Sequence, residues 1–512
     1  MRRLHYAVLA LIQIGLPAGG AAIAGESGDL LLHNVTIVSP ERRAPLDGGW
    51  IAIREGTIAA VGQGEPELDA SWSGVAAVDG RNRYLTPGLI DSHVHLASIP
   101  GFPYPVPAAL APLAAAYEAQ LPRSYLYFGY TTLIDLAVSD RTFLDRFRQR
   151  PLHPDVFDCD GALPMANGYP MAFLPADARF EPYPNFLYDA RQADAIPPRY
   201  SPEAHSPAAA VDRVAANGVI CVKIFWETGF GPLHNLPVPT QAMLAEAVRA
   251  SRTHGLTVTM HANSLAAHRA ATEAGVDVVV HGLWNAPDGF SEPVREVLDT
   301  IVSDGIGYMP TMQVLAGLGL MFQPDFLDDP ALAAVVPEAL IEWYRSEDGQ
   351  WFARELKTDF GGADDEAMRA FQERDDSAPG VSRRTTRYLA ERNARLLFGS
   401  DTPSAPTYGN PPGLNGYLEM KNLAAAGVPL RRLLAAATLE NAKAFGLADR
   451  YGSVEPGKAA NLLLLAANPV ESVEAWDSIE AVVLHGKWIE RSSLSARRLE
   501  ETAADARTGR AN

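Results

Sequence analysis

The stretch Leu85-Thr-Pro-Gly-Leu-Ile-Asp-Ser-His-Val-His95 is an apolar run, punctuated by Pro-Gly, that ends on two histidines. Residues two apart in a β-strand point to the same face, so His93 and His95 share one face at the strand end. Such a pair alone is a weak signal, because two satisfied core histidines would look the same. Two more apolar runs end on histidine, Leu256–His261 and Val276–His281, and three such endings argue against coincidence.

Short apolar runs of this kind alternate with amphipathic helical stretches through the middle of the chain, a pattern typical of βα units and a parallel sheet. The candidate strands end near His95, Asp135, Cys159, Lys223, His261, His281, Thr311 and Asp401. Eight strands predict a (β/α)8 TIM barrel over residues 85–449, with its active site at the carboxyl ends of the strands. The 90 residues from Thr311 to Asp401 exceed one helix and its loops, so we expect a mostly helical insertion at about 313–390.

Residues 29–84 and 450–490 both contain short apolar runs separated by turn residues, which is typical of β-strands. Neither segment could bury a sheet alone. The sequence therefore predicts one small β-sandwich domain formed from both chain ends. The charged, alanine-rich tail at 491–512 is expected to be a helix or frayed.

Residues 1–24 resemble a signal peptide. Arg2 and Arg3 precede a short apolar stretch, and small residues then lead to Ala22-Ile23-Ala24, an A-x-A cleavage pattern. The apolar stretch is shorter than the about 20 residues of a membrane span, and an uncleaved anchor is the alternative. We expect a periplasmic or secreted protein that begins near Gly25 and has no membrane attachment after signal removal.

The composition is that of a globular protein with an acidic surface. Lys and Arg number 43 and Asp and Glu 61, so the net charge of −18 argues against nucleic acid or anionic membranes as partners. A small-molecule substrate is the expected partner, and homo-oligomer formation stays open. Two cysteines cannot form a disulfide scaffold; Cys221 is interpreted as a buried small residue, and a bridge to Cys159 stays open.

Lys223 is the anomaly of its strand, Gly218-Val-Ile-Cys-Val-Lys-Ile-Phe225, in which the other residues indicate a buried parallel strand. A buried ammonium must pair, lose its proton or be modified; the alternative is a lysine that extends to solvent at the strand end. Asp401 ends the apolar run Arg395–Asp401. It is either the cap of a following helix or an acid beside the histidines, whose neutral imidazoles suit zinc and related metals.

In this order, a His-x-His pair, a lysine, two histidines and an aspartate resemble the metal-dependent amidohydrolase superfamily. The similarity is greatest to its secreted imidazolonepropionase-like and prolidase-like (Xaa-Pro dipeptidase-like) members and extends from about residue 29 to 490. Three further segments are similar to the same family: Gly129-Tyr-Thr-Thr-Leu-Ile-Asp135, Ala436-Ala-Thr-Leu-Glu-Asn-Ala442 and Gly452-Ser-Val-Glu-Pro-Gly-Lys-Ala-Ala-Asn461.

The resemblance implies a site with two divalent metal ions, for which zinc is expected. His93, His95 and Asp401 would hold the more buried ion and His261 and His281 the other. A carboxylated Lys223 and a hydroxide would bridge the two ions. The resemblance also implies that Asp401 is the general base and then the general acid of a hydrolysis. Imidazolonepropionases have metal sites that resemble mononuclear ones and lack the bridging lysine, so Lys223 argues against that activity.

The implied function is hydrolysis of an amide or peptide-like C–N bond in a small N-acyl amino acid or dipeptide. Related dipeptidases carry a Tyr or Arg soon after the lysine strand, but the stretch Trp226-Glu-Thr-Gly-Phe-Gly-Pro-Leu-His234 has neither. Trp226, His234 and Tyr308 are candidates to line the substrate pocket, with ordinary loop residues as the alternative. Two other functions stay open: esterase, lactonase or phosphotriesterase activity at the same centre, and a non-catalytic binding protein.

Overall fold

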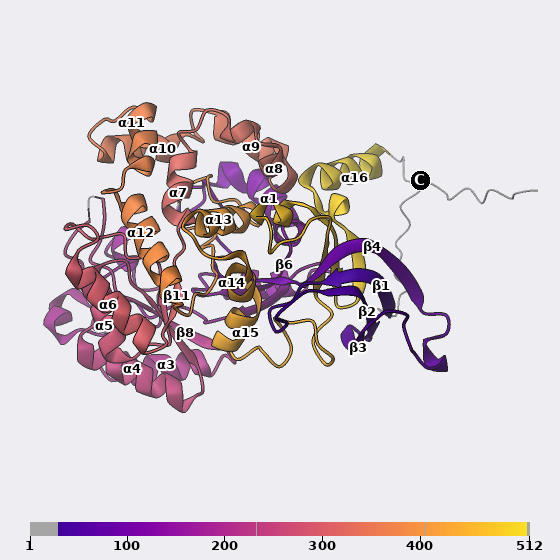
Figure 1. The fold of residues 1–512 in the computed structure, drawn as a ribbon. Coiled ribbons are helices and arrows are strands. Elements are labelled where there is room, and N and C mark those ends of the chain that lie inside the picture. The colour runs from indigo at the N-terminus through magenta and orange to yellow at the C-terminus, as the bar shows by residue number, and fades with distance from the viewer. Residues whose placement is uncertain (1–28, 232, 405, 509–512) are drawn as a thin grey trace, which may run out of the picture.

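The computed structural model describes residues 29–231, 233–404 and 406–508, so the predicted signal peptide at 1–24 lies outside the described residues. The described residues form an α/β fold with three sheets, one of seven strands, one of four and one of three (Figure 1). Within these ranges, no helix combines the length and the apolar character that a membrane span requires.

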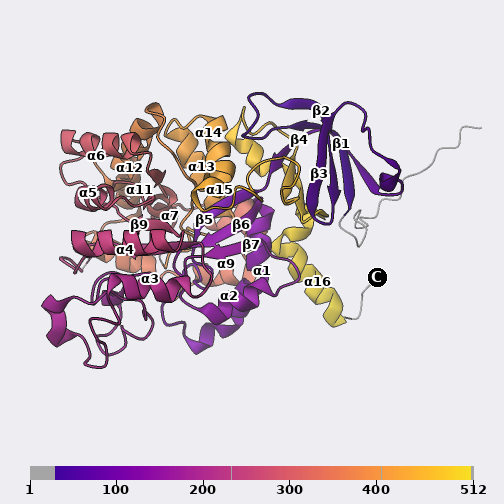
Figure 2. The same ribbon diagram turned by 90° about the horizontal axis from the view of Figure 1, so that it is seen from below.

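The seven-stranded sheet contains strands from both ends of the chain. Its order is β14-β13-β12-β4-β1-β2-β3. The strands are β1 (Leu30–Ile37), β2 (Leu46–Arg54), β3 (Thr57–Gln63), β4 (Ala76–Pro87), β12 (Leu462–Leu465), β13 (Ile479–Leu484) and β14 (Lys487–Glu490). Antiparallel pairing of β12 with β4, in which Leu464 lies opposite Leu85, joins the two ends. Leucine, isoleucine and valine side chains from both ends form one buried cluster, so neither end is buried without the other. Figure 2 shows β1–β4 together at one end of the molecule.

The other two sheets are entirely parallel. One contains β5 (Leu89–Val94), β6 (Tyr130–Asp135) and β7 (Asp155–Asp158), and the other β8 (Cys221–Phe225), β9 (Thr257–His261), β10 (Val278–Val280) and β11 (Gly307–Met309). These seven strands end within two residues of the predicted positions. Their apolar side chains are almost all buried, as expected for a parallel sheet covered on both faces.

The eighth predicted strand, which ends at Asp401, is irregular. Its pairing with the neighbouring strands is limited to isolated bridges, Tyr308 to Leu396 on one side and Val94 to Thr402 on the other. Two features interrupt a regular ladder. The side chain of Asn441 binds both the backbone N–H and the carbonyl of Phe398, and Asp401 has a φ of +54°.

Backbone hydrogen bonds link the two parallel sheets at both of their edges. At one edge, Ile220 N donates to Asp158 O at 3.2 Å, and Leu163 N donates to Lys223 O at 2.8 Å. At the other edge, Tyr308 N donates to Arg395 O at 2.9 Å, and His95 N donates to Thr402 O at 2.8 Å. The irregular segment therefore lies between β11 and β5.

Helices cover the parallel strands (Figures 1 and 2). Those that follow β5 to β10 are α1 (Ala111–Tyr127), α2 (Arg141–Arg148), α3 (Pro207–Ala215), α4 (Gln241–Thr253), α5 (Leu265–Ala274) and α6 (Glu292–Ser303). The side chains of Ser206, Thr240 and Ser264 cap α3, α4 and α5 by accepting hydrogen bonds from backbone N–H groups in the first turn. The apolar faces of these helices share one buried cluster with the outward side chains of the strands, such as Val258 and Met260.

Six α-helices lie between β11 and Asp401. They are α7 (Gln313–Leu320), α8 (Pro330–Val335), α9 (Glu338–Arg345), α10 (Trp351–Asp359), α11 (Asp365–Glu373) and α12 (Ala378–Glu391). After Asp401 come α13 (Leu414–Ala425), α14 (Leu430–Ala435), α15 (Asn441–Ala444) and, in the tail, α16 (Ala496–Thr508).

A disulfide joins Cys159 to Cys221, a pairing that the sequence left open. Cys159 directly follows β7 and Cys221 begins β8, so the bond covalently links the two parallel sheets where they meet. Cys221 and Lys223 lie two residues apart on β8 and share its inward face. Cys221 is therefore a small buried residue that also forms one half of a cross-link, two residues before Lys223.

Asn441 supplies a test of how the irregular segment is held. Its amide donates to Ile90 O at 3.0 Å and to Phe398 O at 2.7 Å, and its carbonyl accepts from Phe398 N at 3.1 Å. Because each buried hydrogen bond contributes about 1 kcal/mol, Asn441→Ala should lower the free energy of unfolding by about 2–3 kcal/mol. Urea denaturation followed by tryptophan fluorescence measures the change.

The matched control is Asn217→Ala, which removes one hydrogen bond from an exposed asparagine to Asp160. Its effect should stay within about 0.5 kcal/mol, as is usual for surface substitutions. Equal denaturation midpoints for the two variants would show that Asn441 does not hold the segment.

Candidate metal centre

Four histidines and one carboxylate converge at the carboxyl ends of the strands. His93, His281 and Asp401 are all buried and offer ligand atoms within 4.8 Å of one another. The Nε2 atoms of His93 and His95 lie 3.1 Å and 2.9 Å from the same Asp401 oxygen, Oδ1. The Nδ1 atom of His281 lies 3.8 Å from the other oxygen, Oδ2. His261 adjoins this group, because its ring centroid is 4.3 Å from that of His281.

Lys223 lies inside the same region and has no contact with solvent. Its side chain is 0% exposed, and its Nζ has no hydrogen-bond partner among the described residues. Burial lowers the pKa of Lys223 to about 7, although the charge of Asp401 acts in the opposite direction. The alternative of a lysine that extends to solvent is therefore wrong. The lowered pKa favours the neutral form of the Lys223 amine, and a neutral amine is a nucleophile.

Burial favours the neutral, ligand-competent form of three of the four histidines, whereas the hydrogen bond to Asp401 raises the pKa of His95 against the effect of burial. Burial lowers the pKa of His93 and of His281 well below the usual value, and the charge of Lys223 adds to both shifts. Burial also lowers the pKa of His261, despite the nearby Glu227. His93 Nδ1 is a second buried polar atom without a hydrogen-bond partner among the described residues. Neutral imidazoles around a carboxylate form a donor set that fits a divalent cation such as zinc.

The backbone at the strand ends is strained. His281, Thr311 and Asp401 have φ values of +81°, +44° and +54°, a left-handed region that residues other than glycine seldom occupy. Each such residue costs about 1–3 kcal/mol and persists only where its surroundings hold it. The Thr311 hydroxyl is hydrogen-bonded to His281 Nδ1 at 2.8 Å, so two of the strained residues orient each other.

A buried polar network connects Asp401 to the strand of the His-x-His pair. Asp91, on β5, accepts from Ser400 N at 2.9 Å and from Ser400 Oγ at 2.5 Å. Asn415 donates to Ser400 O at 2.9 Å and to Thr402 Oγ1 at 2.7 Å. Burial raises the pKa of Asp91 to about 7, against the hydrogen bonds that it accepts. The residues on both sides of Asp401 are thus held in place.

Glu227 is a residue of this site that the sequence analysis did not single out. It is buried, and its Oε2 accepts a hydrogen bond from His261 Nε2 at 3.3 Å and another from Asn263 Nδ2. Its Oε1 accepts from Gly229 N at 2.8 Å. Glu227 lies inside the stretch Trp226–His234, two residues beyond β8, and a carboxylate just after a ligand strand was the signal available.

The three substrate-pocket candidates have different positions. Trp226 is half-buried, and its backbone N donates to His261 O at 3.2 Å, which places it beside the centre. His234 is exposed on the loop after β8. Tyr308 is fully buried, where its hydroxyl accepts from Leu283 N at 2.9 Å and contacts His268 Nε2 at 3.2 Å. Its contacts place Tyr308 against the helix layer, so they do not support a role in lining the pocket.

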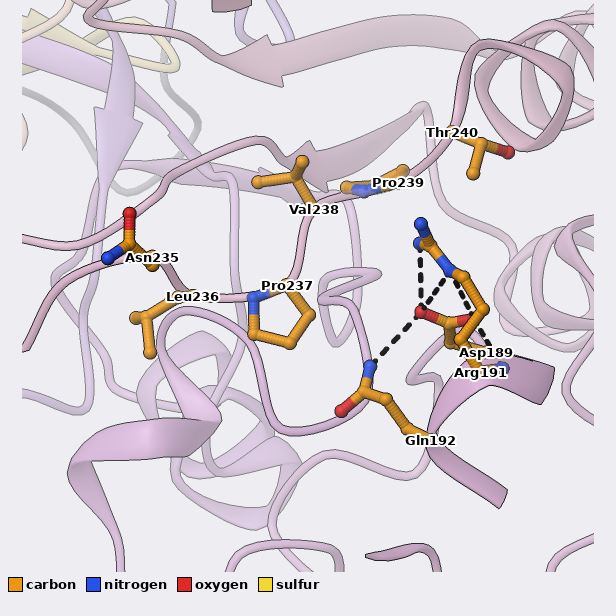
Figure 3. A pocket seen from close by; sticks show the side chains of 9 residues that line it. All are labelled: Asp189, Arg191, Gln192, Asn235, Leu236, Pro237, Val238, Pro239 and Thr240. Atoms are coloured by element: carbon orange, nitrogen blue, oxygen red, sulfur yellow. Dashed lines mark hydrogen bonds and ion pairs between the residues drawn. The ribbon is translucent and has the colours of Figure 1, made fainter. Parts of the chain in front are cut away.

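A separate hollow lies beside the loop that carries His234 (Figure 3). Its volume is about 510 Å³. It is lined by Asp189, Arg191, Gln192, Asn235, Leu236, Pro237, Val238, Pro239 and Thr240. The Asp189 carboxylate accepts hydrogen bonds from Arg191 and Gln192. None of the six candidate ligands lines this hollow, so it is distinct from the metal centre.

This chain is similar to known proteins in two ways: in the sequence of short segments and in the overall fold. A segment of 80 residues is 38% identical to adenine deaminase from Ruegeria pomeroyi and spans 15% of this chain and 13% of that protein. A segment of 64 residues is 33% identical to imidazolonepropionase from Streptococcus pyogenes serotype M1 and spans 12% of this chain and 15% of that protein. The chain therefore matches less than a fifth of the length of these curated relatives.

A crystal structure of a Xaa-Pro dipeptidase with bound methionine in the active site has the same fold over most of both molecules. Its TM-score is 0.64 at 21% identity, and the match covers 90% of this chain and 100% of that chain. The model of the amidohydrolase family matches residues 233–489, which is half of the chain and includes His261, His281 and Asp401. The chain therefore belongs to the amidohydrolase family.

Proposed function

We propose that the protein is a metal-dependent hydrolase that cleaves an amide or peptide-like C–N bond in a small substrate, an N-acyl amino acid or a dipeptide. The observation that carries this proposal is the convergence of four histidines and Asp401 around a buried lysine that has no hydrogen-bond partner. The names of two similar proteins, a deaminase and a dipeptidase, describe reactions at C–N bonds and agree with this choice.

We also infer that residues 85–449 form a closed (β/α)8 barrel, with the helices at about 313–390 as an insertion, and that 29–84 and 450–490 form one β domain. Hydrogen bonds at both edges of the two parallel sheets, through Ile220 and through Arg395, support closure. In such a barrel the active site lies at the carboxyl ends of the strands, where the candidate ligands are.

The ligands divide between two ions, for which zinc is the expected metal because nitrogen and oxygen donors suit it. His93, His95 and Asp401 would hold the first ion, and His261 and His281 the second. Lys223 would bridge them after its neutral amine adds to carbon dioxide, which forms an N–C bond and releases one proton. The resulting carbamate is negatively charged. Two bound cations would offset the cost of burying a carbamate, whereas they would repel an ammonium.

Bound divalent ions would supply two effects: they lower the pKa of a coordinated water from about 15.7 to about 7, and they polarise the substrate carbonyl. The chain supplies the proton transfer. Asp401 would take a proton from the attacking water and deliver it to the leaving nitrogen, acting first as general base and then as general acid. Asp91, Ser400 and Asn415 would keep Asp401 in position during both transfers.

The first test of this function uses the purified, zinc-loaded protein and a panel of N-acetyl amino acids, dipeptides, lactones and carboxylic esters. We expect turnover of amides or dipeptides, and a fall in kcat/KM of about 100-fold or more on chelation that added zinc reverses. Asp401→Asn should abolish turnover, because an amide cannot carry the proton. Turnover of esters or lactones with no cleavage of any amide would contradict the proposal.

Lys223 tests the two-metal site. The native protein should hold about two zinc ions per chain, and Lys223→Ala should lose both metal and activity, with partial rescue by short-chain carboxylates. Lys223→Arg should fail as well, because a guanidinium stays charged and cannot form a carbamate. Elemental analysis and native mass spectrometry measure the metal content. The control Lys443→Ala removes a lysine paired with Glu440 at the surface and should retain both ions. Two ions and a normal rate in Lys223→Arg would rule out the carbamate.

Glu227 is a positioning residue in this proposal. Its carboxylate accepts the Nε2 proton of His261 and so leaves Nδ1 to bind metal. Glu227→Ala should weaken binding of the second zinc ion by about 10–100-fold, as is usual when such a partner is removed. Competition with a fluorescent zinc chelator measures the two affinities separately. Glu246→Ala, which removes a half-buried carboxylate bound to Ala208 N, is the control. Equal affinities in both variants would mean that His261 needs no such partner.

A further inference from the structure

A continuous group of aromatic rings extends outward from the metal centre. It consists of Tyr169, Phe173, Phe225 and Phe230, which we call the aromatic wall. The ring centroids of Tyr169 and Phe225 lie 5.1 Å and 5.5 Å from that of His261. Tyr169 lies 5.3 Å from Phe225 and 5.5 Å from Phe230, and Phe230 lies 5.4 Å from Phe173. The rings thus form a path from a candidate metal ligand to the surface.

The exposure of the rings changes along this path. Phe225 is 8% exposed, whereas Phe173 and Phe230 are 47% and 49% exposed. Aromatic rings packed only for stability are mostly covered by the protein, and exposed apolar patches beside a site mark surfaces that take a ligand. About half of each outer ring remains available to a bound molecule.

The wall combines segments that the fold brings together at the strand ends. Tyr169 and Phe173 belong to the segment after β7, Phe225 ends β8, and Phe230 lies on the loop after β8. Phe225 lies two residues beyond Lys223, and Lys223 Nζ is 5.6 Å from its ring. A molecule with its reacting bond at the metal centre would therefore have its neighbouring group against the wall.

The chemistry of the aromatic wall further restricts which substrate group can lie next to the reacting bond. The Glu227 carboxylate binds the His261 ring that Tyr169 contacts. A carboxylate of the substrate packed against the wall would lose its hydration and find no cationic side chain among the four rings, whereas an uncharged ring can pack offset or edge-on against them.

We propose that the aromatic wall is the specificity subsite of this enzyme and takes an uncharged aromatic substituent next to the scissile bond. This inference rests on the proposed metal-dependent hydrolysis for the placement of that bond. The outer rings of Phe173 and Phe230 set the preference for an aromatic over a small substituent, and Tyr169 with Phe225 forms the inner surface.

The test compares two metal-binding probes, benzohydroxamate and acetohydroxamate, which differ in a phenyl against a methyl group. Calorimetry on the zinc-loaded full chain gives the ratio of their dissociation constants. We expect the native protein to bind benzohydroxamate at least about 10-fold more tightly, and Phe230→Ala and Phe173→Ala each to reduce this ratio at least about 3-fold. The dissociation constant of acetohydroxamate should stay within about 2-fold, which also shows that the variants are folded and loaded.

Two further variants make the result specific. Phe230→Leu keeps an apolar side chain and should have an intermediate ratio. Trp72→Ala, which removes a ring packed on Arg54 in the β domain, should keep the native ratio. An unchanged ratio in both phenylalanine variants overturns the subsite, as does an equal fall in the Trp72 variant.

Kinetics separate this inference from the proposed function. The substrate pairs are N-acetylphenylalanine with N-acetylalanine and N-benzoylglycine with N-acetylglycine, which place the ring on either side of the amide. Loss of the aromatic preference in Phe230→Ala in either pair supports the subsite and identifies the side. If no amide is cleaved but the hydroxamate ratio falls, the proposed reaction fails and the subsite stands. If amides are cleaved and neither ratio changes, the subsite fails and the reaction stands.

Discussion

The burial of the Lys223 amine among neutral histidines is the constraint on which the rest of the centre depends. A charged ammonium with no partner is costly in such a place, so the group must stay neutral, bind a counter-charge or be modified. The surroundings favour the neutral form, because burial lowers its pKa to about 7. The same burial lowers the pKa of His93, His261 and His281 and so favours their neutral forms. Each group is therefore less able to hold a proton than it would be in water.

The candidate ligands must be held in fixed positions, and one of the segments that carries them is not part of a regular sheet. The segment that carries Asp401 has no continuous ladder, yet the side chains of Asn441, Asn415 and Asp91 bind its backbone. These bonds hold Asp401 at a positive φ. The Cys159–Cys221 disulfide adds a covalent link between the two parallel sheets just below Lys223. Strain at the site is thus offset by hydrogen bonds and a cross-link around it.

The candidate ligands and the proposed substrate contacts come from different kinds of structure. The candidate ligands lie at strand ends, whose positions the packed core determines. The aromatic wall comes largely from the segments after β7 and β8, which can change without disturbing the strands. Such a division would let one kind of metal centre serve substrates of different shape, and family membership alone does not define the substrate.

The sequence by itself determined the order of the candidate ligands and the strands that carry them. Apolar runs that end in His95, Lys223, His261 or His281 are local signals, because a parallel strand that is buried on both faces consists of consecutive apolar residues. Only the tertiary structure decided the contacts between distant segments. The Cys159–Cys221 pairing, the buried position of Tyr308, the bond from His261 to Glu227 and the irregular segment at 396–402 all depend on which strand ends and loops meet. No local sequence pattern predicts these contacts. Each partner lies tens or hundreds of residues away, or in a loop whose path depends on its neighbours.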